Sequence, residues 1–292
     1  MHLTGNTRHR LALIALVVLA LLWGYNWVVM KVAVHDAPPF VFAATRALGG
    51  GMVLFVVALL LRRRVVPQRP GAFLWIGLFQ TGIFVGLVTW AVVSAGAGQV
   101  AMLAYTMPLW VALIAWPVLG ERIGVVHAVA ILIAFLGIAC MIGPQHRIGF
   151  PQVLAVLAGV SWAIGVVIAK VVQRDRSIDL FNLTMWQLIF GGIALAVVAL
   201  AVPGRPVVWD APYLFAVAYN IVLATALAYF LWIFVLNELP ARDASMGTLA
   251  NPVIGVVAAW IQLGETPTLL SGIGMVLVLL GLAVVSLAPR GS

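Results

Sequence analysis

Side chains able to do chemistry are scarce in this 292-residue chain, and the most compact group of them is Trp23-Gly24-Tyr25-Asn26-Trp27. Indole and phenol rings bind an apolar substrate group well, and side-chain amides orient its polar end. The same ring types also anchor membrane proteins at the lipid–water interface, so each ring has that alternative role. The residues that we predict to bind a substrate are Trp23, Asn26, Arg46, Trp90, Tyr105, Trp162, Trp186, Gln187 and Asn251.

Two cations, Arg46 and Lys31, lie deep in apolar segments. Arg46 is roughly 12 Å from the outer end of its predicted span, at about 1.5 Å of rise per residue. A charge at such depth is costly and usually faces a water-filled cavity. For Arg46 two roles stay open: it either pairs with a substrate carboxylate or lines a pathway, or it snorkels to the interface. For Lys31, which is nearer the end of its span, snorkelling is favoured.

The chain carries no arrangement of residues typical of an enzyme or a metal site. No Ser/His/Asp set, phosphate-binding loop or His-x-x-x-His pair lies in the apolar segments. We therefore predict no enzymatic activity, no cofactor and no metal. Proton-driven carriers commonly place a carboxylate or a histidine inside the membrane, and this sequence has none near the middle of a predicted span. Facilitated diffusion and a coupling route that the sequence does not reveal therefore both stay open. The acidic residues all fall at or near the ends of apolar segments: Asp36, Glu121, Asp175, Asp179, Asp210, Glu238, Asp243 and Glu265.

The composition indicates that the segments carrying these residues lie in a lipid bilayer. Charged residues make up 8% of the chain and apolar residues 64%, with a mean hydropathy of +1.17, whereas a soluble domain carries roughly 25% charged residues. The apolar runs are continuous, which predicts α-helices rather than the alternating strands of a barrel. The net charge of +8 comes from residues at the ends of these runs and does not indicate nucleic-acid binding. The expected partners are a lipid bilayer and a small-molecule substrate.

The apolar runs predict ten transmembrane helices, since a bilayer core needs about 20 residues per helix. Basic residues favour one side: twelve lie in the alternate segments that include the N-terminus, and three lie in the other segments. By the positive-inside rule both termini are cytoplasmic, and we expect a multi-pass protein of a bacterial inner membrane. The predicted spans are 11–33, 38–61, 71–93, 97–117, 124–143, 150–171, 179–201, 212–236, 242–262 and 267–287.

The second half of the chain repeats the first. Four residues recur at an offset of 144: Pro108, Gly120, Glu121 and Gly137 match Pro252, Gly264, Glu265 and Gly281. We predict two five-helix repeats, residues 1–146 and 147–292. Because five is odd, the second repeat crosses the membrane in the opposite sense, which is typical of secondary transporters with a site between their repeats. Pro108 and Pro252 are predicted helix breaks that would supply backbone polarity there, or else structural kinks.

These motifs resemble those of the EamA-type families of the drug/metabolite transporter superfamily, over essentially the whole chain. The resemblance is carried by Trp23-Gly24-Tyr25-Asn26-Trp27 and Arg46, by Pro108 followed by Leu119-Gly120-Glu121-Arg122, and by Asn251-Pro252 followed by Leu263-Gly264-Glu265. Within the superfamily the chain is most similar to the YddG-type amino-acid exporters of bacterial inner membranes. The resemblance implies a ten-helix inverted-repeat fold, a central cavity and export of aromatic and other apolar amino acids. Glu121 and Glu265, at loop positions, would brace helices rather than bind substrate.

The sequence therefore predicts an exporter of amino acids or related metabolites that works by alternating access, as a monomer or a homodimer. An exporter of drugs or other cations is an alternative, which the lack of a carboxylate at mid-depth disfavours. Import is another, because sequence does not fix the direction of net flux. A membrane enzyme or a scaffold is the alternative from another class, and it would need a polar catalytic cluster or soluble appendages that the chain lacks.

Overall fold

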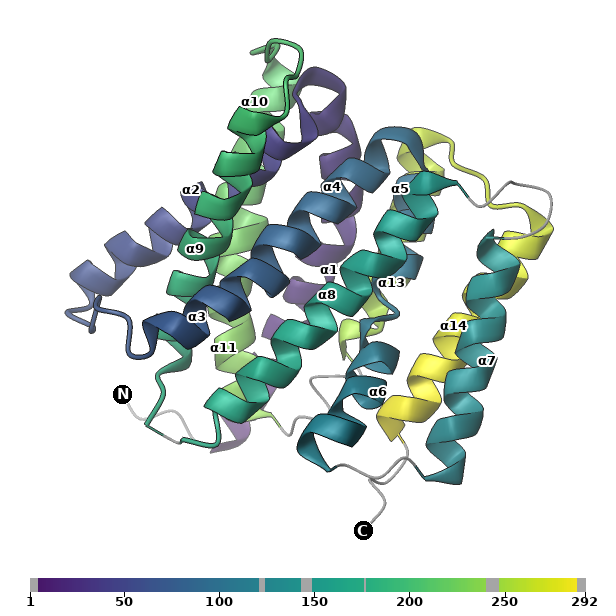
Figure 1. Cartoon of the computed structure of the whole chain (residues 1–292), viewed down its shortest axis with the longest axis horizontal. Coiled ribbons are helices and arrows are strands. Elements are labelled where there is room, and N and C mark those ends of the chain that lie inside the picture. Colours follow the sequence, from purple (N-terminus) through teal and green to yellow (C-terminus); the bar gives the residue numbers. More distant parts are fainter. Residues whose placement is uncertain (1–4, 121–123, 143–148, 176, 240–246, 288–292) are drawn as a thin grey trace.

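The computed structural model describes residues 5–120, 124–142, 149–175, 177–239 and 247–287, and Figure 1 shows them as one bundle of helices. No strand occurs among these residues. The helices are α1 (Gly5–Asp36), α2 (Pro39–Leu60), α3 (Pro70–Gly77), η1 (Leu78–Ile83), α4 (Phe84–Ser94), α5 (Ala97–Ala104), α6 (Met107–Leu119), α7 (Val125–Ile142), α8 (Phe150–Val172), α9 (Leu180–Ala201), α10 (Ala211–Ala218), η2 (Tyr219–Leu227), α11 (Ala228–Glu238), α13 (Ala250–Leu263) and α14 (Leu269–Leu287).

Local signals in the sequence set where many of these helices begin. Pro residues occupy the first turn of α2, α3, α6, α8 and α10, where the missing backbone N–H has no helical partner in any case. Asp179 caps α9 by accepting a hydrogen bond from the Phe181 amide, 2.9 Å away. Asp210 caps α10 by accepting one from the Tyr213 amide, also 2.9 Å away.

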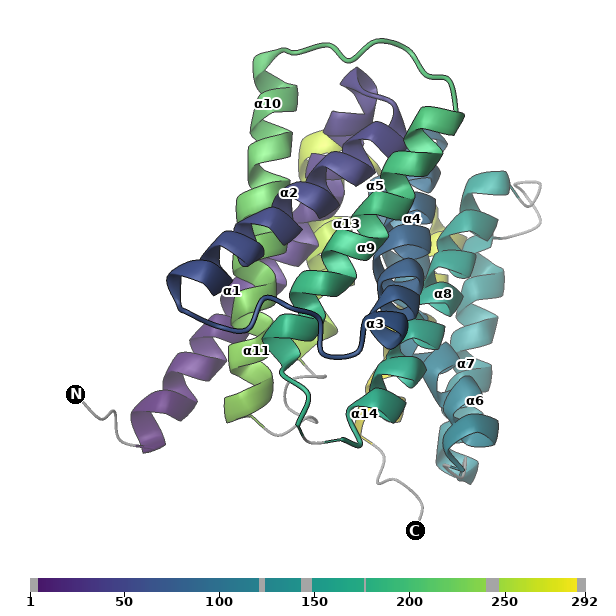
Figure 2. The same cartoon turned by 60° about the vertical axis from the view of Figure 1, so that its left-hand side comes forward.

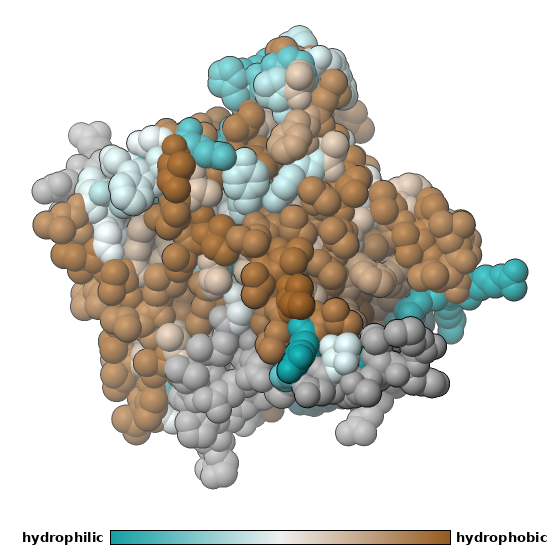
Figure 3. All heavy atoms as spheres, turned by 180° about the vertical axis from the view of Figure 1, so that it is seen from behind, coloured by the Kyte–Doolittle hydropathy of each residue, from teal (hydrophilic) through white to brown (hydrophobic). Residues whose placement is uncertain are grey.

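Seven helical stretches of the described chain are long and apolar enough to cross a membrane. Three further apolar helices, Val125–Met141, Ala250–Leu263 and Leu269–Val284, are shorter. Each predicted span overlaps one of these helices, and the count of ten crossings stays a prediction because the three short ones fall below about 20 residues. Figure 3 shows apolar side chains over the middle of one face and hydrophilic ones toward its ends. Large apolar residues such as Leu132, Leu200 and Leu269 are more than half exposed, as a lipid-facing surface requires.

The two halves share the same irregularities of the backbone. A π-helical segment interrupts one long helix in each half, η1 in the first and η2 in the second. A glycine in the left-handed region ends α6 and α13: Gly120 with φ 72° and Gly264 with φ 67°, a conformation that side chains with a Cβ rarely adopt. Two helical segments with a Pro in the first turn, α6 and α13, precede those glycines.

The first long helices of the two halves, α1 and α8, run in opposite directions. Lys31, near the C-terminal end of α1, bonds the carbonyl groups that end α4. Gln152, in the first turn of α8, bonds Gln99 in the first turn of α5, and α5 follows α4 after a short turn. The end of α1 and the start of α8 therefore lie on the same side of the bundle. In Figure 2 the connector between α9 and α10 crosses that side, where Arg205 Nη2 bonds the Val34 carbonyl oxygen at 2.9 Å.

Glycines let the helices approach closely between the halves. A Cβ at Gly191 of α9 would lie 2.4 Å from the Gly77 oxygen and from the Thr81 side chain, and one at Gly50 of α2 would lie 2.2 Å from Thr225 in η2. The α7 and α14 helices pack chiefly against each other at the right-hand edge in Figure 1. There a Cβ at Gly137 would lie 2.6 Å from the Gly274 oxygen. The remaining helices surround the polar residues described next.

Candidate functional site

Arg46 is a partly buried cation in the first half of α2, in contact with α1 of its own half and near tyrosines of the other half. Its Nη1 lies 2.8 Å from the Met30 sulfur on α1. The phenols of Tyr229 and Tyr219 are close enough to interact electrostatically with the guanidinium. Among the described residues, none of the ion pairs includes Arg46. The site therefore holds a positive charge in contact with a thioether sulfur and near two phenols, and no carboxylate of the described part of the chain neutralises it.

Aromatic side chains of α1 and the η2–α11 helix form one wall beside Arg46. The Trp23 indole donates a hydrogen bond to the carbonyl oxygen of Ala224 at 3.0 Å, and its ring meets Tyr229 edge to face with centroids 5.7 Å apart. The Tyr219 hydroxyl donates to the Leu22 carbonyl oxygen at 2.8 Å. These bonds hold the rings in fixed orientations, which a binding site for an apolar side chain needs.

A second group of residues lies at the break between α5 and α6, where the Tyr105 ring meets Trp27 of α1 with centroids 6.1 Å apart. Helix α5 ends at Ala104, and Pro108 lies in the first turn of α6. At the break, the Tyr105 hydroxyl accepts a hydrogen bond from Nδ2 of Asn251 at 2.9 Å. Asn251 precedes Pro252 in the first turn of α13, so both proline-containing segments contribute to the same contact.

Further contacts join these two groups into one, which we call the central cluster. Tyr105 and Gln187 of α9 each interact electrostatically with Tyr229. Asn26 lies one helical turn before Met30 and is 5% exposed. The central cluster consists of Trp23, Asn26, Arg46, Tyr105, Gln187, Tyr219, Tyr229 and Asn251.

Three predicted site residues make other contacts. Trp90 is 39% exposed and packs edge to face on Phe150 and Phe40, with centroids 5.0 and 5.6 Å apart. Trp162 of α8 packs on Phe84, with centroids 4.8 Å apart. The Trp186 indole donates to the Val65 carbonyl oxygen at 2.8 Å and so fastens the connector after α2.

Tyr219 and Tyr229 were missing from the predicted set. The repeat offset offers a signal for their neighbourhood, because Arg46 and Gln187 are 141 positions apart, as are Phe40 and Phe181. The two halves therefore place Arg46 and Gln187 at equivalent points, and the tyrosines lie beside both.

Lys31 and Glu265 clamp the turn between α4 and α5. Lys31 Nζ donates to the carbonyl oxygens of Val92 at 2.7 Å and Ala95 at 2.9 Å. The Glu265 carboxylate accepts from the amides of Ala97 at 2.9 Å and Gly98 at 3.1 Å. Both charges complement the helix dipoles they face. The expectation that Lys31 snorkels to the interface stays a prediction, whereas Glu265 braces the start of α5 as expected; Glu121 lies outside the described residues.

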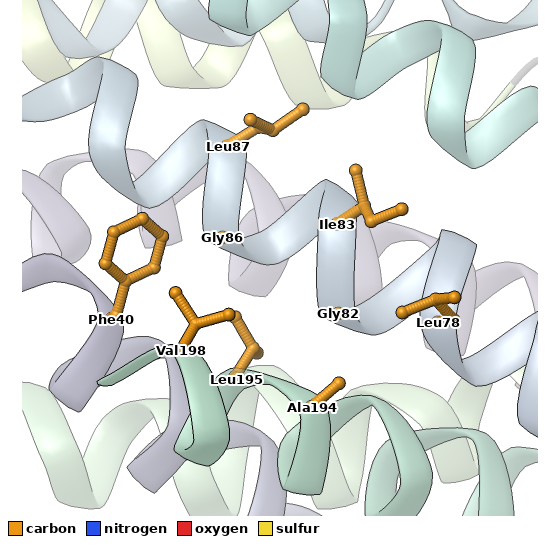
Figure 4. A pocket seen from close by; sticks show the side chains of 9 residues that line it. All are labelled: Phe40, Leu78, Gly82, Ile83, Gly86, Leu87, Ala194, Leu195 and Val198. Carbon is orange, nitrogen blue, oxygen red and sulfur yellow. The ribbon is translucent and has the colours of Figure 1, made fainter. Parts of the chain in front are cut away.

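An apolar groove lies apart from these polar residues, between α2, η1, α4 and α9 (Figure 4). It encloses about 160 Å³. No charged or amide side chain lines it, so it offers nothing to hold the polar end of a metabolite. Its lining residues are Phe40, Leu78, Gly82, Ile83, Gly86, Leu87, Ala194, Leu195 and Val198.

Comparison with known proteins gives the family. Residues 10–143 and 150–287 each match the EamA-like transporter family. The chain is 27% identical over 280 residues to an uncharacterized transporter, YoaV, of Bacillus subtilis, covering 92% of this chain and 94% of that one. It is 26% identical over 284 residues to a probable amino-acid metabolite efflux pump of Salmonella typhimurium, covering 93% and 92%.

A solved crystal structure with 20% sequence identity has a TM-score of 0.65 and covers 94% of this chain and 96% of that one, which shows the shared fold. Matches in both halves cover nearly the whole chain. The protein is thus a multi-pass membrane protein and belongs to the EamA-like transporter family.

Proposed function

We propose that the protein exports amino acids, aromatic and other apolar ones above all, across a bacterial inner membrane. The observation that carries this proposal is Arg46, a cation without an acidic partner among the described residues, which interacts electrostatically with Tyr219 and Tyr229, the latter in ring contact with Trp23. A guanidinium away from bulk water favours an anionic partner and binds a carboxylate through paired N–H groups. The rings beside it provide the surface that an apolar side chain needs.

The proposed mechanism is alternating access between two inverted five-helix repeats, residues 1–146 and 147–292, in a chain of ten spans. The antiparallel course of α1 and α8 and the paired irregularities η1 and η2 support this arrangement. The central cluster draws residues from both halves, so a rocking motion would expose it to one side at a time. The protein acts on its cargo without enzymatic chemistry, as a monomer or a homodimer.

A transport assay tests the cargo. Purified protein is reconstituted into liposomes, and the uptake of radiolabelled phenylalanine, tryptophan, methionine and a cationic dye is measured with and without a pH gradient. The proposal predicts saturable flux of the amino acids and none of the dye. Flux of the dye without flux of the amino acids would instead establish the cation exporter. Dependence on the gradient separates proton coupling from facilitated diffusion.

The direction of net transport and the orientation of the chain in the membrane need separate measurements. The printed name of the Salmonella relative, an efflux pump, supports export, and loaded cells or inside-out vesicles measure the direction of net flux. For orientation, both termini are proposed to be cytoplasmic. Single cysteines at Arg64 and Pro203, in a background with Cys140→Ala, should be labelled by a membrane-impermeant maleimide from opposite faces. Labelling of both from the same face would contradict the proposed topology.

A further inference from the structure

The connector between α2 and α3 carries two arginines that no acidic residue balances. Four exposed arginines lie on this connector: Arg62, Arg63, Arg64 and Arg69. Arg63 pairs with Asp179 across 3.8 Å. Arg69 pairs with Asp175 across 2.6 Å. Arg62 and Arg64 take part in none of the ion pairs of the described residues, so their charges are open to a partner outside the chain.

Helix α9 holds the backbone of this connector in place. Asn182 Nδ2 donates to the carbonyl oxygens of Arg64 at 2.8 Å and Val66 at 3.2 Å. The Trp186 indole donates to the Val65 carbonyl oxygen at 2.8 Å. These three carbonyl groups are satisfied within the chain, so the connector offers a partner its side chains, on a backbone that is already fixed.

Arg62 ends α2 in a backbone conformation that favours glycine. It is the one non-glycine residue in the described part of the chain with a positive φ, 52°. The Arg62 amide bonds the Leu59 carbonyl oxygen at 3.0 Å and the Arg63 amide bonds that of Ala58 at 2.8 Å, a helix end at which glycine is common. Helices α6 and α13 do end in a left-handed glycine. An arginine here costs stability that a glycine would not, which indicates a use for its charge.

The last turns of α2 carry an apolar stripe that leads to these arginines. Met52, Val56 and Leu60 are spaced by four residues and so share one side of the helix. They are 57%, 47% and 77% exposed. In Figures 1 and 2 this end of α2 projects from the bundle. A cation directly beyond a lipid-facing apolar surface matches an anion that carries apolar chains.

We propose that Arg62 and Arg64 bind the phosphate of an anionic phospholipid whose acyl chains lie along Met52, Val56 and Leu60. In the proposed orientation this lipid belongs to the cytoplasmic leaflet. A guanidinium binds phosphate through paired N–H groups, and arginines next to a membrane span are attracted to anionic lipids. A zwitterionic lipid adds an ammonium group, which the arginines repel. Basic residues that only set the orientation of the chain would need no strained backbone.

Native mass spectrometry of the purified protein in an uncharged detergent tests the proposal by counting bound lipids. The protein is titrated with phosphatidylglycerol or with phosphatidylethanolamine of the same acyl chains. A basic residue at an anionic surface contributes about fivefold in affinity, so the double variant Arg62→Gln, Arg64→Gln should bind phosphatidylglycerol roughly 25-fold more weakly. Its binding of phosphatidylethanolamine should not change. The matched control is Arg69→Gln, which removes the same charge from the same connector but from a residue already paired with Asp175, and it should change the affinity by less than about twofold.

A second variant, Arg62→Gly, separates lipid binding from folding. It removes the charge and also relieves the left-handed backbone at φ 52°. We expect its melting temperature in lipid-free detergent to exceed that of the wild type, while its affinity for phosphatidylglycerol falls about fivefold. Damage to the fold would lower both quantities together, so the opposite changes are specific to the proposal.

Three results would overturn the lipid site. The first is equal affinity of the wild-type protein for the two lipids. The second is a loss of affinity in Arg69→Gln as large as in the double variant, which would leave only a general effect of charge. The third is displacement of phosphatidylglycerol by inorganic phosphate, which would make this a site for soluble anions. The comparison of lipids on wild-type protein needs no variant, and no arm of the test depends on the cargo of the transporter.

Discussion

Removing the Glu265 carboxylate should loosen the clamp that it forms with Lys31 on the turn before α5. Glu265→Ala deletes two charge-assisted hydrogen bonds, to the amides of Ala97 and Gly98 at 2.9 and 3.1 Å. Hydrogen bonds to charged groups contribute about 1.5–3 kcal/mol each. Because Glu265 is partly exposed, the lower end applies, and the expected loss is about 2–4 kcal/mol. Glu265→Gln keeps one acceptor oxygen and should cost less.

Thermal unfolding in detergent measures this loss, since about 1 kcal/mol corresponds to roughly 2 °C in the melting temperature of a chain of this size. Hydrogen exchange at the amides of Ala97 and Gly98 reports the same contact locally. The control is Glu238→Gln, because Glu238 pairs with Arg8 across 3.5 Å, with the Arg8 side chain 52% exposed, and such solvent-accessible ion pairs contribute about 0–1 kcal/mol. If Glu265→Ala melts like this control, or if exchange at both amides is unaltered, the reasoning about the clamp is wrong.

Two further predictions concern packing and acid stability. Gly191→Ala places a Cβ 2.4 Å from the Gly77 oxygen and should lower the free energy of unfolding by about 1–3 kcal/mol through overpacking. Gly71→Ala, whose Cβ would have nothing within 4 Å, should cause no such loss. The melting temperatures of the two variants measure the difference. The hydrogen bonds from Ser177 hold the pKa of Asp175 below the usual value of an aspartate. Its contribution to stability is therefore present at neutral pH and lost as the pH falls through the lowered pKa, and Asp175→Asn should remove that part of the acid dependence of unfolding.

Much of the fold follows from the sequence because lipid restricts what a backbone can do. A continuous apolar run in lipid must be helical, so each predicted span overlaps an observed helix, and α8, predicted over 150–171, covers Phe150–Val172. The π-helical segments η1 and η2 were not predicted, since no residue type signals them and tertiary packing against glycines such as Gly50 and Gly191 accompanies them.

The candidate site was predicted unevenly, and the direction of side chains explains why. Depth in a span is readable from residue counting, and it singled out Arg46; Asn251 was singled out as the neighbour of Pro252, and the roles of both stay predictions. The direction in which a ring points depends on the rotation of its helix against its neighbours, which counting does not give. Trp162 and Trp186 therefore contact Phe84 and the Val65 carbonyl group, while Tyr219 was overlooked although it lies beside Arg46.

The most direct test of the account is the counterflow of phenylalanine in proteoliposomes containing wild-type protein, Arg46→Gln or Arg46→Lys. Arg46→Gln removes the charge that we propose to bind the carboxylate, so flux should fall at least tenfold. Arg46→Lys keeps a charge without the paired N–H geometry and should retain intermediate flux. Wild-type flux from Arg46→Gln, in a protein that remains folded, would contradict the claim that this cation binds the substrate.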